Sequence, residues 1–202
     1  MSIYALKPKF QDLLRPMVRR LHAWGVTANQ VTVAACAVSV ALGLGLYALE
    51  QPSVWFALVP LWMFLRMALN AIDGMLAREF GQCSALGGYL NELTDVVSDA
   101  ALYLPFVWIA PFSGLQIGLV IWLAAMSELA GVLGVVAGAS RRYDGPVGKS
   151  DRAFVFGALG LWIAFGLALP VAASYVMWAI AALTAWTCVR RVRAGLSELA
   201  AK

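Results

Sequence analysis

The sequence predicts an all-α integral membrane protein in which six membrane-spanning helices follow an amphipathic interfacial helix, all within one domain over residues 1–202. The first observation behind this prediction is composition. Of the 202 residues, 62% are hydrophobic and only 13% are charged, which is too apolar for a soluble domain of this size. The second is the recurrence of apolar runs of about 20 residues, the length that a membrane-crossing helix needs. The third is that Lys and Arg gather in alternate connections between these runs.

The first expected element is an amphipathic helix over residues 8–22. Its apolar residues recur at helical spacing, and cations occupy its other faces. We expect this helix to lie in the headgroup region with its apolar face toward the lipid; a solvated basic tail is the alternative. Thr27 or Asn29 can cap the next helix, since both side chains accept hydrogen bonds from free backbone N–H groups. No short apolar run with a cleavage site follows the basic start, and we therefore expect no removable signal peptide.

Six apolar runs follow this segment, and each is long enough for one crossing. The expected spans cover residues 31–49, 54–72, 85–109, 115–137, 153–169 and 171–188. An even number of crossings places both termini on the same side of the membrane. The connections near 50–53, 111–114 and 170 contain no Lys or Arg, whereas those on the opposite side are basic. This asymmetry predicts that both termini are cytoplasmic, and we expect a bacterial inner membrane.

The net charge of +4 does not by itself indicate nucleic-acid binding. The cations cluster between apolar runs, as suits the anionic lipid of a cytoplasmic membrane face. Cys36, Cys83 and Cys188 are far apart and form neither a disulfide framework nor a zinc-ligand pattern. We therefore expect the lipid bilayer as a partner, and no nucleic acid.

Polar residues interrupt the second and third spans in step with the helical repeat. They are three or four residues apart in each span, so each set shares one helix face. The two sets are Arg66, Asn70 and Asp73, and Asn91, Asp95 and Asp99. A charge inside a bilayer is costly, so these faces are expected to face one another or water. A magnesium or manganese ion bound through oxygen would neutralise the carboxylates. The alternatives are a neutral polar network, in which Arg66 or Arg78 pairs the acids, and proton or ion transport.

Small residues lie between the two polar faces. Gly74, Ala77 and Gly87 leave room for a ligand close to the backbone. Arg78 can donate two parallel hydrogen bonds to a phosphate group. A metal, an arginine and a cleft of small residues at the cytoplasmic boundary together predict a lipid-linked phosphate or pyrophosphate substrate.

This stretch resembles the CDP-alcohol phosphotransferase (CDP-alcohol phosphatidyltransferase) family, whose pattern is Asp-x2-Asp-Gly-x2-Ala-Arg-x8-Gly-x3-Asp-x3-Asp. The chain reads Asn70-x2-Asp73-Gly74-x2-Ala77-Arg78-x8-Gly87-x3-Asn91-x3-Asp95. Every spacing matches, and six of the eight defined residues match in type. The six spans and the amphipathic N-terminal helix are also similar to the family, so the resemblance covers nearly the whole chain.

The resemblance implies transfer of a phosphatidyl group from a CDP-linked lipid, such as CDP-diacylglycerol, to an alcohol acceptor, with release of CMP, in phospholipid biosynthesis. It implies Mg²⁺ or Mn²⁺ as the cofactor and Asp95 as the base for the acceptor hydroxyl. The implied metal ligands are Asn70, Asp73, Asn91 and Asp95, with Asp99 as a further candidate one turn deeper. The implied nucleotide and pyrophosphate pocket consists of Gly74, Ala77, Arg78 and Gly87.

Two asparagines are the departure from the family pattern. Asn70 and Asn91 can ligate a metal through their amide oxygens, but they bring no charge to a site that would balance about +4. Asp99 and Glu92 are the nearby acids that could compensate. Because all the spacings are kept, we favour a modified metal site in an active enzyme. The alternatives are a catalytically silent relative that binds nucleotide or lipid as an interaction subunit, and an ion-coupled transporter.

Cations surround a Gly-Pro-x-Gly turn between the fourth and fifth spans. Among them, Arg141, Lys149 and Arg152 are candidates for binding the acceptor or a phosphate; positive charge on the cytoplasmic face is the alternative explanation. Glu128 inside the fourth span is expected to pair with a cation or with bound water. A homodimer is compatible with the resemblance and with the small residues in the spans, although no segment specifies it.

Overall fold

The computed structural model describes residues 6–202, with side chains described from residue 10 onward. Residues 1–5 of the expected domain lie outside the described residues. In the described part the regular elements are all helical, which confirms the all-α prediction. The elements are α1 (Leu6–Ala23), α2 (Ala28–Tyr47), η2 (Val54–Ala57), α3 (Leu58–Glu79), α4 (Ala85–Tyr103), η3 (Leu104–Trp108), α5 (Gly114–Val136), α6 (Lys149–Ala164) and α7 (Ala173–Ala200).

Side-chain caps determine where several helices begin. The hydroxyl of Thr27 accepts the backbone N–H of Gln30 at 3.2 Å, and the Gln30 side chain accepts the N–H of Thr27 at 2.9 Å. Thr27, rather than Asn29, is therefore the cap of α2. The hydroxyl of Ser84 accepts the N–H of Gly87 at 2.9 Å at the start of α4. Each cap satisfies a backbone donor that has no partner inside its helix.

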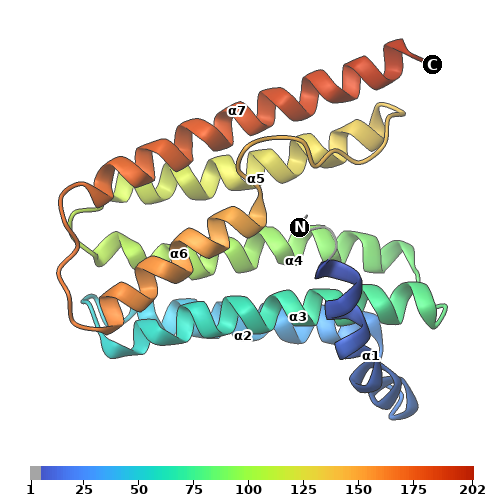
Figure 1. Cartoon of the computed structure of the whole chain (residues 1–202), viewed down its shortest axis with the longest axis horizontal. Coiled ribbons are helices and arrows are strands. Elements are labelled where there is room, and N and C mark those ends of the chain that lie inside the picture. Colours follow the sequence, from blue (N-terminus) through green and yellow to red (C-terminus); the bar gives the residue numbers. More distant parts are fainter. Residues whose placement is uncertain (1–5) are drawn as a thin grey trace.

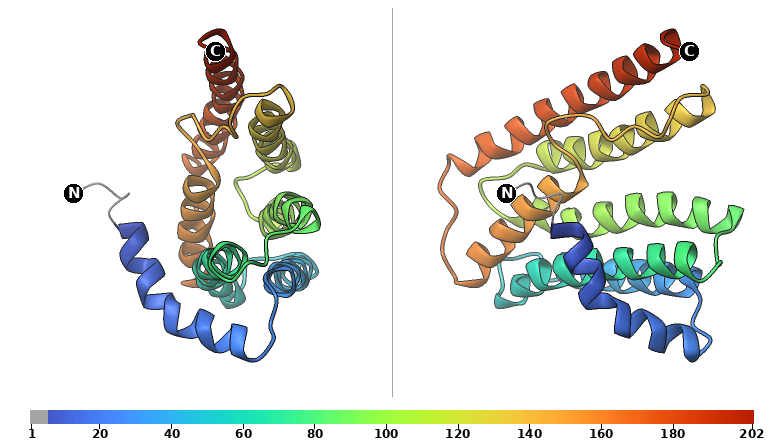
Figure 2. Two further views of the ribbon diagram at one scale, coloured as in Figure 1. Left: turned by 90° about the vertical axis from the view of Figure 1, so that its right-hand side faces the viewer. Right: turned by 45° about the vertical axis from the view of Figure 1, so that its right-hand side comes forward.

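The helices form an elongated bundle (Figure 1). α2 packs against α3 and α4, α5 packs against α7, and α3 also contacts the inclined helix α6. α1 lies outside this bundle and crosses α3 (Figure 2). An ion pair of 2.5 Å between Arg15 Nη1 and Glu79 Oε2 joins α1 to the end of α3.

The connection between α5 and α6 folds back along the bundle, so that α6 begins part of the way along its length (Figure 1). The N–H of Arg142 donates to the carbonyl oxygen of Gly131 at 3.2 Å, and the N–H of Val147 donates to Thr187 Oγ1 at 3.2 Å. Gly145 allows this close approach, because a Cβ atom there would lie 2.5 Å from Thr187 Cγ2. As a result, the first turn of α6 is placed among the other helices rather than at the end of the bundle.

Charged contacts fasten the outer part of this connection to α7. Arg142 pairs with Asp144 at 2.9 Å and with Glu198 at 2.7 Å. Hydrogen bonds from the hydroxyl and the backbone N–H of Ser140, at 2.6 and 2.9 Å, lower the pKa of Glu198 to about 2. The hydrogen bond from Arg142 likewise holds the pKa of Asp144 below its usual range. Both carboxylates are therefore charged in the folded protein at neutral pH.

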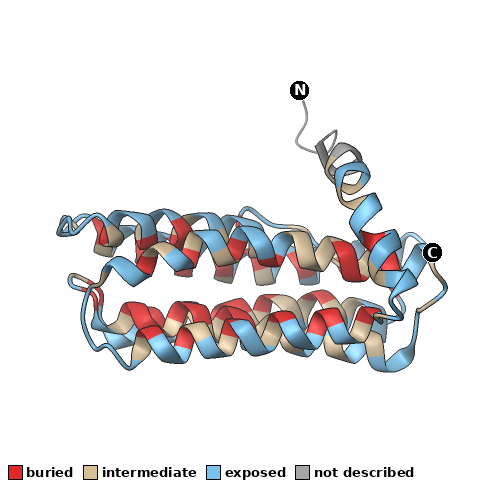
Figure 3. Ribbon diagram, turned by 90° about the horizontal axis from the view of Figure 1, so that it is seen from below, coloured by how far each residue is buried: buried red, intermediate tan, exposed pale blue. Residues whose placement is uncertain are grey.

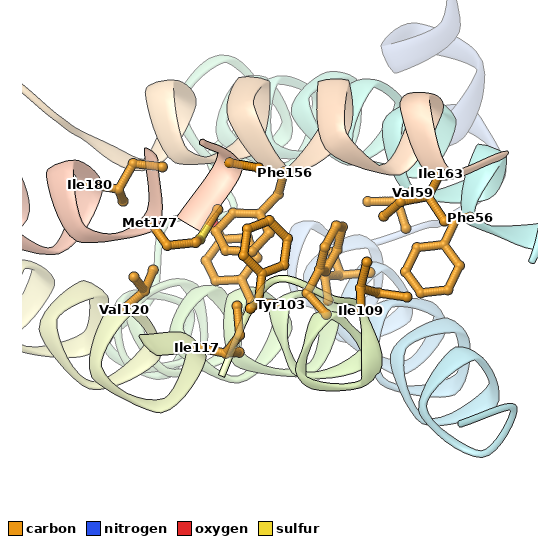
Figure 4. Close-up of a cluster of buried hydrophobic side chains, with 14 of the residues drawn as sticks. Phe56, Val59, Tyr103, Ile109, Ile117, Val120, Phe156, Ile163, Met177 and Ile180 are labelled. Atoms are coloured by element: carbon orange, nitrogen blue, oxygen red, sulfur yellow. The ribbon is translucent and has the colours of Figure 1, made fainter. Parts of the chain in front are cut away.

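The largest apolar core joins α3, α4, α5, α6 and α7 near the end of the bundle away from the basic connections. Tyr103 stacks on Phe156 with ring centroids 3.9 Å apart, and Phe106 meets Phe156 edge-on at 5.0 Å. Figure 4 shows Tyr103 and Phe156 near Met177 and Val120. The stack fixes the position of α6 relative to α4.

Burial in this molecule differs from that of a soluble protein, because ionised groups are buried as well as the apolar core, and large apolar side chains are exposed. Arg66 and Asp99 are each 5% exposed and Arg152 is fully buried, whereas Phe154 is 76% exposed. Figure 3 shows that buried and exposed positions share every long helix of the bundle. Large apolar side chains facing outward and ionised groups facing inward are what a lipid environment favours.

Three segments are long and apolar enough to cross a membrane among the described residues: Ala28–Tyr47, Val54–Glu79 and Gly114–Val136, with mean hydropathies of 1.7, 1.5 and 2.1. The helix ends differ from the expected spans where polar residues extend a helix. α6 begins at Lys149, because the Asp151 carboxylate accepts the N–H of Gly148 at 2.8 Å, and it ends before Gly166, which has a φ of +71°. α3 continues to Glu79, and several residues of its last two turns line a cavity.

Candidate functional site

A cavity of about 300 Å³ opens where α2 and α4 begin and α3 ends. Its walls come from these three helices and from the connection between α3 and α4. Six of the residues singled out in the sequence line it: Asp73, Gly74, Ala77, Arg78, Gly87 and Asn91. The end of α3 and the start of α4, which carry the motif, therefore line the same cavity.

The two glycines of the motif are sites of close approach. A Cβ atom at Gly87 would lie 2.9 Å from Asn29 Oδ1 and 3.1 Å from Ser84 Oγ. A Cβ atom at Gly74 would lie 2.9 Å from Arg78 Nη2, so the guanidinium group folds back over this glycine. Arg78 is exposed on the cavity wall and forms no ion pair with the side chains of residues 10–202. Its donors are free to bind an anion.

Asp73 lies at the inner end of this cavity. It is 6% exposed, and its Oδ2 atom accepts the hydroxyl of Thr32 at 2.7 Å. Thr32 also donates to the carbonyl oxygen of Ala28 at 3.0 Å, which fixes its side chain against α2. α2 therefore orients the Asp73 carboxylate toward the cavity.

Arg66 joins Asp95 and Asp99, two of the three acids of α4. Its Nη2 atom lies 3.0 Å from Asp95 Oδ1, and its Nη1 atom lies 2.5 Å from Asp99 Oδ1. The amide nitrogen of Asn70 is 3.4 Å from the same Asp95 oxygen. Lys149 at the start of α6 also contacts this oxygen. Arg66 therefore pairs with both acids, whereas Arg78 pairs with neither.

Ion pairs continue from Asp99 toward α5 and α7. Arg152 Nη2 lies 3.6 Å from Asp99 Oδ2 and 3.4 Å from Glu128 Oε1. Glu128 also receives Arg141 at 3.2 Å and Arg191 at 3.4 Å. Arg141 Nη1 is 2.6 Å from Glu92 Oε1. The expected pairing of Glu128 with a cation is confirmed, and the partners are three arginines.

A second, mostly apolar groove of about 570 Å³ lies between α3 and α6. Its apolar walls include Met63, Phe64, Ala153 and Phe154. Its polar end is formed by Arg66, Asn70, Lys149 and Ser150. This end adjoins Asp95, because Asn70 and Lys149 both contact the Asp95 carboxylate.

The structure thus groups the expected site residues in three neighbouring places. Asp73 and the other five motif residues that line the cavity form the first group. Asn70 and Lys149 line the groove, and both contact the Asp95 carboxylate. Asp99 and Arg152 lie deeper, inside the ion-pair cluster, and line neither space. Arg141 lies on the far side of the cluster, against Glu92 and Glu128.

Several residues of the site carry no strong sequence signal. Asn29 and Thr32 line the cavity from α2, and Gln82 and Ser84 line it from the α3–α4 connection. Single small polar residues at helix ends are common, and only the fold brings these four to the motif. Arg191 pairs with Glu128 and stands one turn after Thr187 on the buried face of α7. Its neighbours Arg190 and Arg193 are exposed, so the basic run alone does not single it out.

Oxygen donors near the motif are the side chains that could hold a divalent cation. Among the described residues no three His, Cys, Asp or Glu side chains are grouped to hold a metal. Asp73 and Asp95 each keep one carboxylate oxygen outside the contacts described above. With the amide oxygens of Asn70 and Asn91 they form an all-oxygen set of the kind that Mg²⁺ and Mn²⁺ prefer. Arg66 and Lys149 already pair with Asp95, so a divalent ion would have to share this carboxylate with them.

A helical membrane bundle with this motif at one end defines a class of lipid-linked phosphotransferases. The family profile described as CDP-alcohol phosphatidyltransferase matches residues 25–186, and the chain belongs to this family of metal-dependent enzymes. Among its relatives, the inner membrane protein YnbA of Escherichia coli is 44% identical over 202 residues, covering 97% of both chains. The phosphatidylinositol phosphate synthase of Corynebacterium glutamicum is 27% identical, and the match covers 99% of this chain and 91% of that protein.

Solved structures show the same fold. The phosphatidylinositol phosphate synthase of Mycobacterium tuberculosis, crystallised in complex with manganese and citrate, matches with a TM-score of 0.74 at 23% identity, over 90% of this chain and 88% of that one. The same enzyme with CDP-DAG bound matches with a TM-score of 0.74 at 22% identity, over 89% of this chain and 92% of that one. The chain is therefore a multi-pass membrane protein with this fold.

Proposed function

We propose that this protein transfers a phosphatidyl group from a CDP-linked lipid, such as CDP-diacylglycerol, to the hydroxyl group of an alcohol and releases CMP, as a step of phospholipid biosynthesis. The observation that carries the proposal is the common cavity of Asp73, Gly74, Ala77, Arg78, Gly87 and Asn91, with Asp95 beside it. The related structure that holds CDP-DAG supports the choice of donor.

The cavity and the groove suit the two parts of such a donor. Arg78 offers unpaired N–H donors to the pyrophosphate, and Gly74 and Gly87 let the nucleotide approach the backbone. The apolar groove between α3 and α6 suits an acyl chain, since its polar end lies at Asp95 and its walls are apolar. The reacting phosphate would then lie between the cavity and the groove.

Asp95 is the candidate base, and its position supports a direct displacement. Its carboxylate would take the proton of the acceptor hydroxyl as the acceptor oxygen bonds to the phosphorus atom. The bond from that phosphorus to the oxygen of CMP would break, and CMP would leave. Lys149 and Arg66 hold the Asp95 carboxylate in place. Asn70, Asp73, Asn91 and Asp95 would hold a magnesium or manganese ion, whose charge would offset that of the pyrophosphate.

The acceptor would approach from the side of α5 and α6. Arg141, Lys149 and Arg152 lie on this side of Asp95, and we assign them to the acceptor side of the site. Asp99 is placed to orient Arg66 and Arg152 and is a weaker candidate for a metal ligand.

The proposal includes a placement in the membrane. The single domain would cross a bacterial inner membrane six times, with both termini in the cytoplasm and α1 in the headgroup region. The basic connections and the cavity lie at the same end of the bundle, so the active site would open to the cytoplasm. The name of the Escherichia coli relative as an inner membrane protein supports this location.

The test is CMP release from CDP-diacylglycerol by the protein purified in detergent, with Mg²⁺ or Mn²⁺ and a panel of alcohols. We expect metal-dependent release that Asp95→Asn abolishes. Asn70→Asp combined with Asn91→Asp tests whether carboxylates at all four motif positions raise the rate. Absence of release from the native protein together with release from this double variant would contradict the assignment of the native protein as an enzyme.

A silent, lipid-binding role is the second candidate. The contacts of Arg66 and Lys149 with Asp95, together with the two asparagines, are the observations that favour it. This role predicts that CDP-diacylglycerol binds without CMP release, and that binding depends on Arg78. Binding and release measured on the same preparation distinguish the two roles.

A further inference from the structure

The cations on the acceptor side of Asp95 are all occupied by carboxylates of the protein. Lys149 contacts Asp95, Arg141 lies 2.6 Å from Glu92, and Arg152 lies 3.4 Å from Glu128. Arg191 lies 3.4 Å from the second oxygen of Glu128. With Arg66 and Asp99 included, five cations meet four acids in this cluster, a net excess of one positive charge. Each of the five cations nevertheless has a carboxylate partner.

Glu128 is the acid that pairs with most of the arginines in this cluster. It lies inside α5 with a side chain only 12% exposed, and it receives three arginines at 3.2–3.4 Å. The Nε atoms of Arg152 and Arg191 have no hydrogen-bond partner, but both are enclosed and offer no accessible anion site. A phosphate on the acceptor would have to displace Glu128 or Glu92, leaving a carboxylate unpaired in a buried place, which is strongly unfavourable.

The donor side shows the opposite arrangement. Arg78 lines the cavity, is exposed, and has no acid partner within residues 10–202. The site is thus equipped for one anionic substrate at Arg78 and for none at Arg141, Arg152 and Arg191. A cation that binds phosphate needs accessible donors, and the guanidinium groups of Arg141, Arg152 and Arg191 are all held by Glu92 or Glu128.

We infer that the alcohol acceptor carries no phosphate group and that Glu92 and Glu128 are the residues that exclude phosphorylated alcohols. This inference rests on the proposed transferase function and narrows its acceptor to a non-anionic alcohol, such as a polyol or an amino alcohol. Glu92 and Glu128 are positioning residues in this account, since they act through Arg141 and Arg152.

The first test compares matched acceptors in the CMP-release assay with CDP-diacylglycerol and Mg²⁺. The pairs are glycerol with glycerol 3-phosphate, and myo-inositol with inositol 1-phosphate. We expect release with an unphosphorylated alcohol to exceed release with its phosphorylated partner by about tenfold or more. Faster release with the phosphorylated member overturns the inference. Absence of release with every alcohol counts against the proposed transferase function, and the acceptor class is then decided by binding.

The second test measures binding of glycerol 3-phosphate by calorimetry, in an Arg78→Ala background that removes the anion site on the nucleotide side. We expect no binding at millimolar concentration, and binding at least about tenfold tighter after Glu128→Gln, which leaves three arginines without their shared acid. Glu92→Gln, at a half-buried position, is the milder variant if Glu128→Gln fails to fold. Glu50→Gln removes an exposed acid on a distant connection and is the matched control for charge.

Two outcomes of the binding test overturn the inference. One is binding of glycerol 3-phosphate in the Arg78→Ala background that Arg141→Ala abolishes, because the cluster would then accept phosphate with its acids in place. The other is the absence of binding after both Glu92→Gln and Glu128→Gln in proteins whose thermal unfolding shows that they are folded. Shifted acceptor preference toward the phosphorylated member in Glu92→Gln supports the inference with a readout that loss of stability does not produce.

Discussion

At the scale of single residues, Arg66 decides whether the acids of α4 can be buried. Its guanidinium group lies between Asp95 and Asp99, and its side chain is only 6% exposed. An acid in this environment without a partner would be strongly destabilising, because its charge loses hydration without gaining a compensating ion. The burial of Asp95 and Asp99 in the folded protein therefore depends on Arg66.

Replacing Arg66 tests this dependence directly. We expect Arg66→Met to lower the free energy of unfolding by about 3 kcal/mol, because Asp95 and Asp99 each lose one ion-pair partner and keep only Lys149 and Arg152. Adding Asp99→Asn should restore part of this loss, since one of the two acids is then neutral. The measurement is thermal unfolding in detergent, with Arg78→Met as the control for removing an arginine of the same helix that makes no ion pair. Equal losses for Arg66→Met and Arg78→Met would argue against the pairing.

At the scale of elements, the first turn of α4 shows how local sequence shapes the cavity. Gly87 and Gly88 are adjacent in this turn, but their surroundings differ. A Cβ atom at Gly87 would press on Asn29 and on the Ser84 cap, whereas a Cβ atom at Gly88 would meet nothing within 4 Å. The two positions therefore form a matched pair for testing the cavity.

We expect Gly87→Ala to weaken CDP-diacylglycerol binding by about tenfold, the effect of about 1.4 kcal/mol, because the added methyl group displaces two side chains of the cavity wall. Gly88→Ala should weaken binding less, because its methyl group also lies at the cavity wall but displaces no side chain. Calorimetric binding to the detergent-purified variants provides the measurement. If both alanine variants bind the lipid equally well, the cavity is not the nucleotide site.

The contact between the α5–α6 connection and α7 has a defined pH dependence. Ser140 and Arg142 hold Glu198, whose folded pKa of about 2 lies below the unfolded value of about 4.3. A lowered folded pKa means that this contact stabilises the protein fully above the unfolded pKa. The stabilisation is lost as pH falls from about 4.3 toward about 2, where the carboxylate becomes protonated.

Glu198→Gln should therefore be less stable than the native protein at neutral pH, and the difference should shrink below about pH 4. Thermal unfolding of both proteins across this range measures it, and Glu50→Gln controls for general loss of negative charge. A difference that stays constant down to pH 2 would show that the charge of Glu198 does not contribute to the contact.

The sequence predicted the helices more accurately than the connections between them. The 3.6-residue periodicity of Asn91, Asp95 and Asp99 predicted one inward face of α4, and ion pairs to Asp95 and Asp99 confirm it. The fold-back of residues 137–148 was not foreseen, because it depends on contacts with Gly131 and Thr187 in distant helices. That fold-back brings Lys149 to Asp95. Pairing partners of Glu128 were unpredictable for the same reason, since α5, α6 and α7 meet only in three dimensions.

At the scale of the whole molecule, the cavity and the basic connections share one end of the bundle. Cys83 lies at this end, in the exposed connection between α3 and α4, and it lines the cavity. Glu50 lies in the connection after α2, at the opposite end, and is exposed. Because these two positions are separated by the length of α3, their labelling from either side of a membrane reports the orientation of the entire chain.

The proposed orientation predicts opposite labelling at these positions by a membrane-impermeant maleimide. In a Cys36→Ala/Cys188→Ala background expressed in Escherichia coli, Cys83 should react in inverted membrane vesicles and stay unmodified in intact spheroplasts. After Cys83→Ser and Glu50→Cys, the introduced thiol should react in spheroplasts instead. The physical reason is that basic connections remain on the cytoplasmic side, whereas the connection that holds Glu50 carries no Lys or Arg. Reversed labelling at both positions would place the cavity outside the cell, where a CDP-linked donor made in the cytoplasm could not reach Arg78.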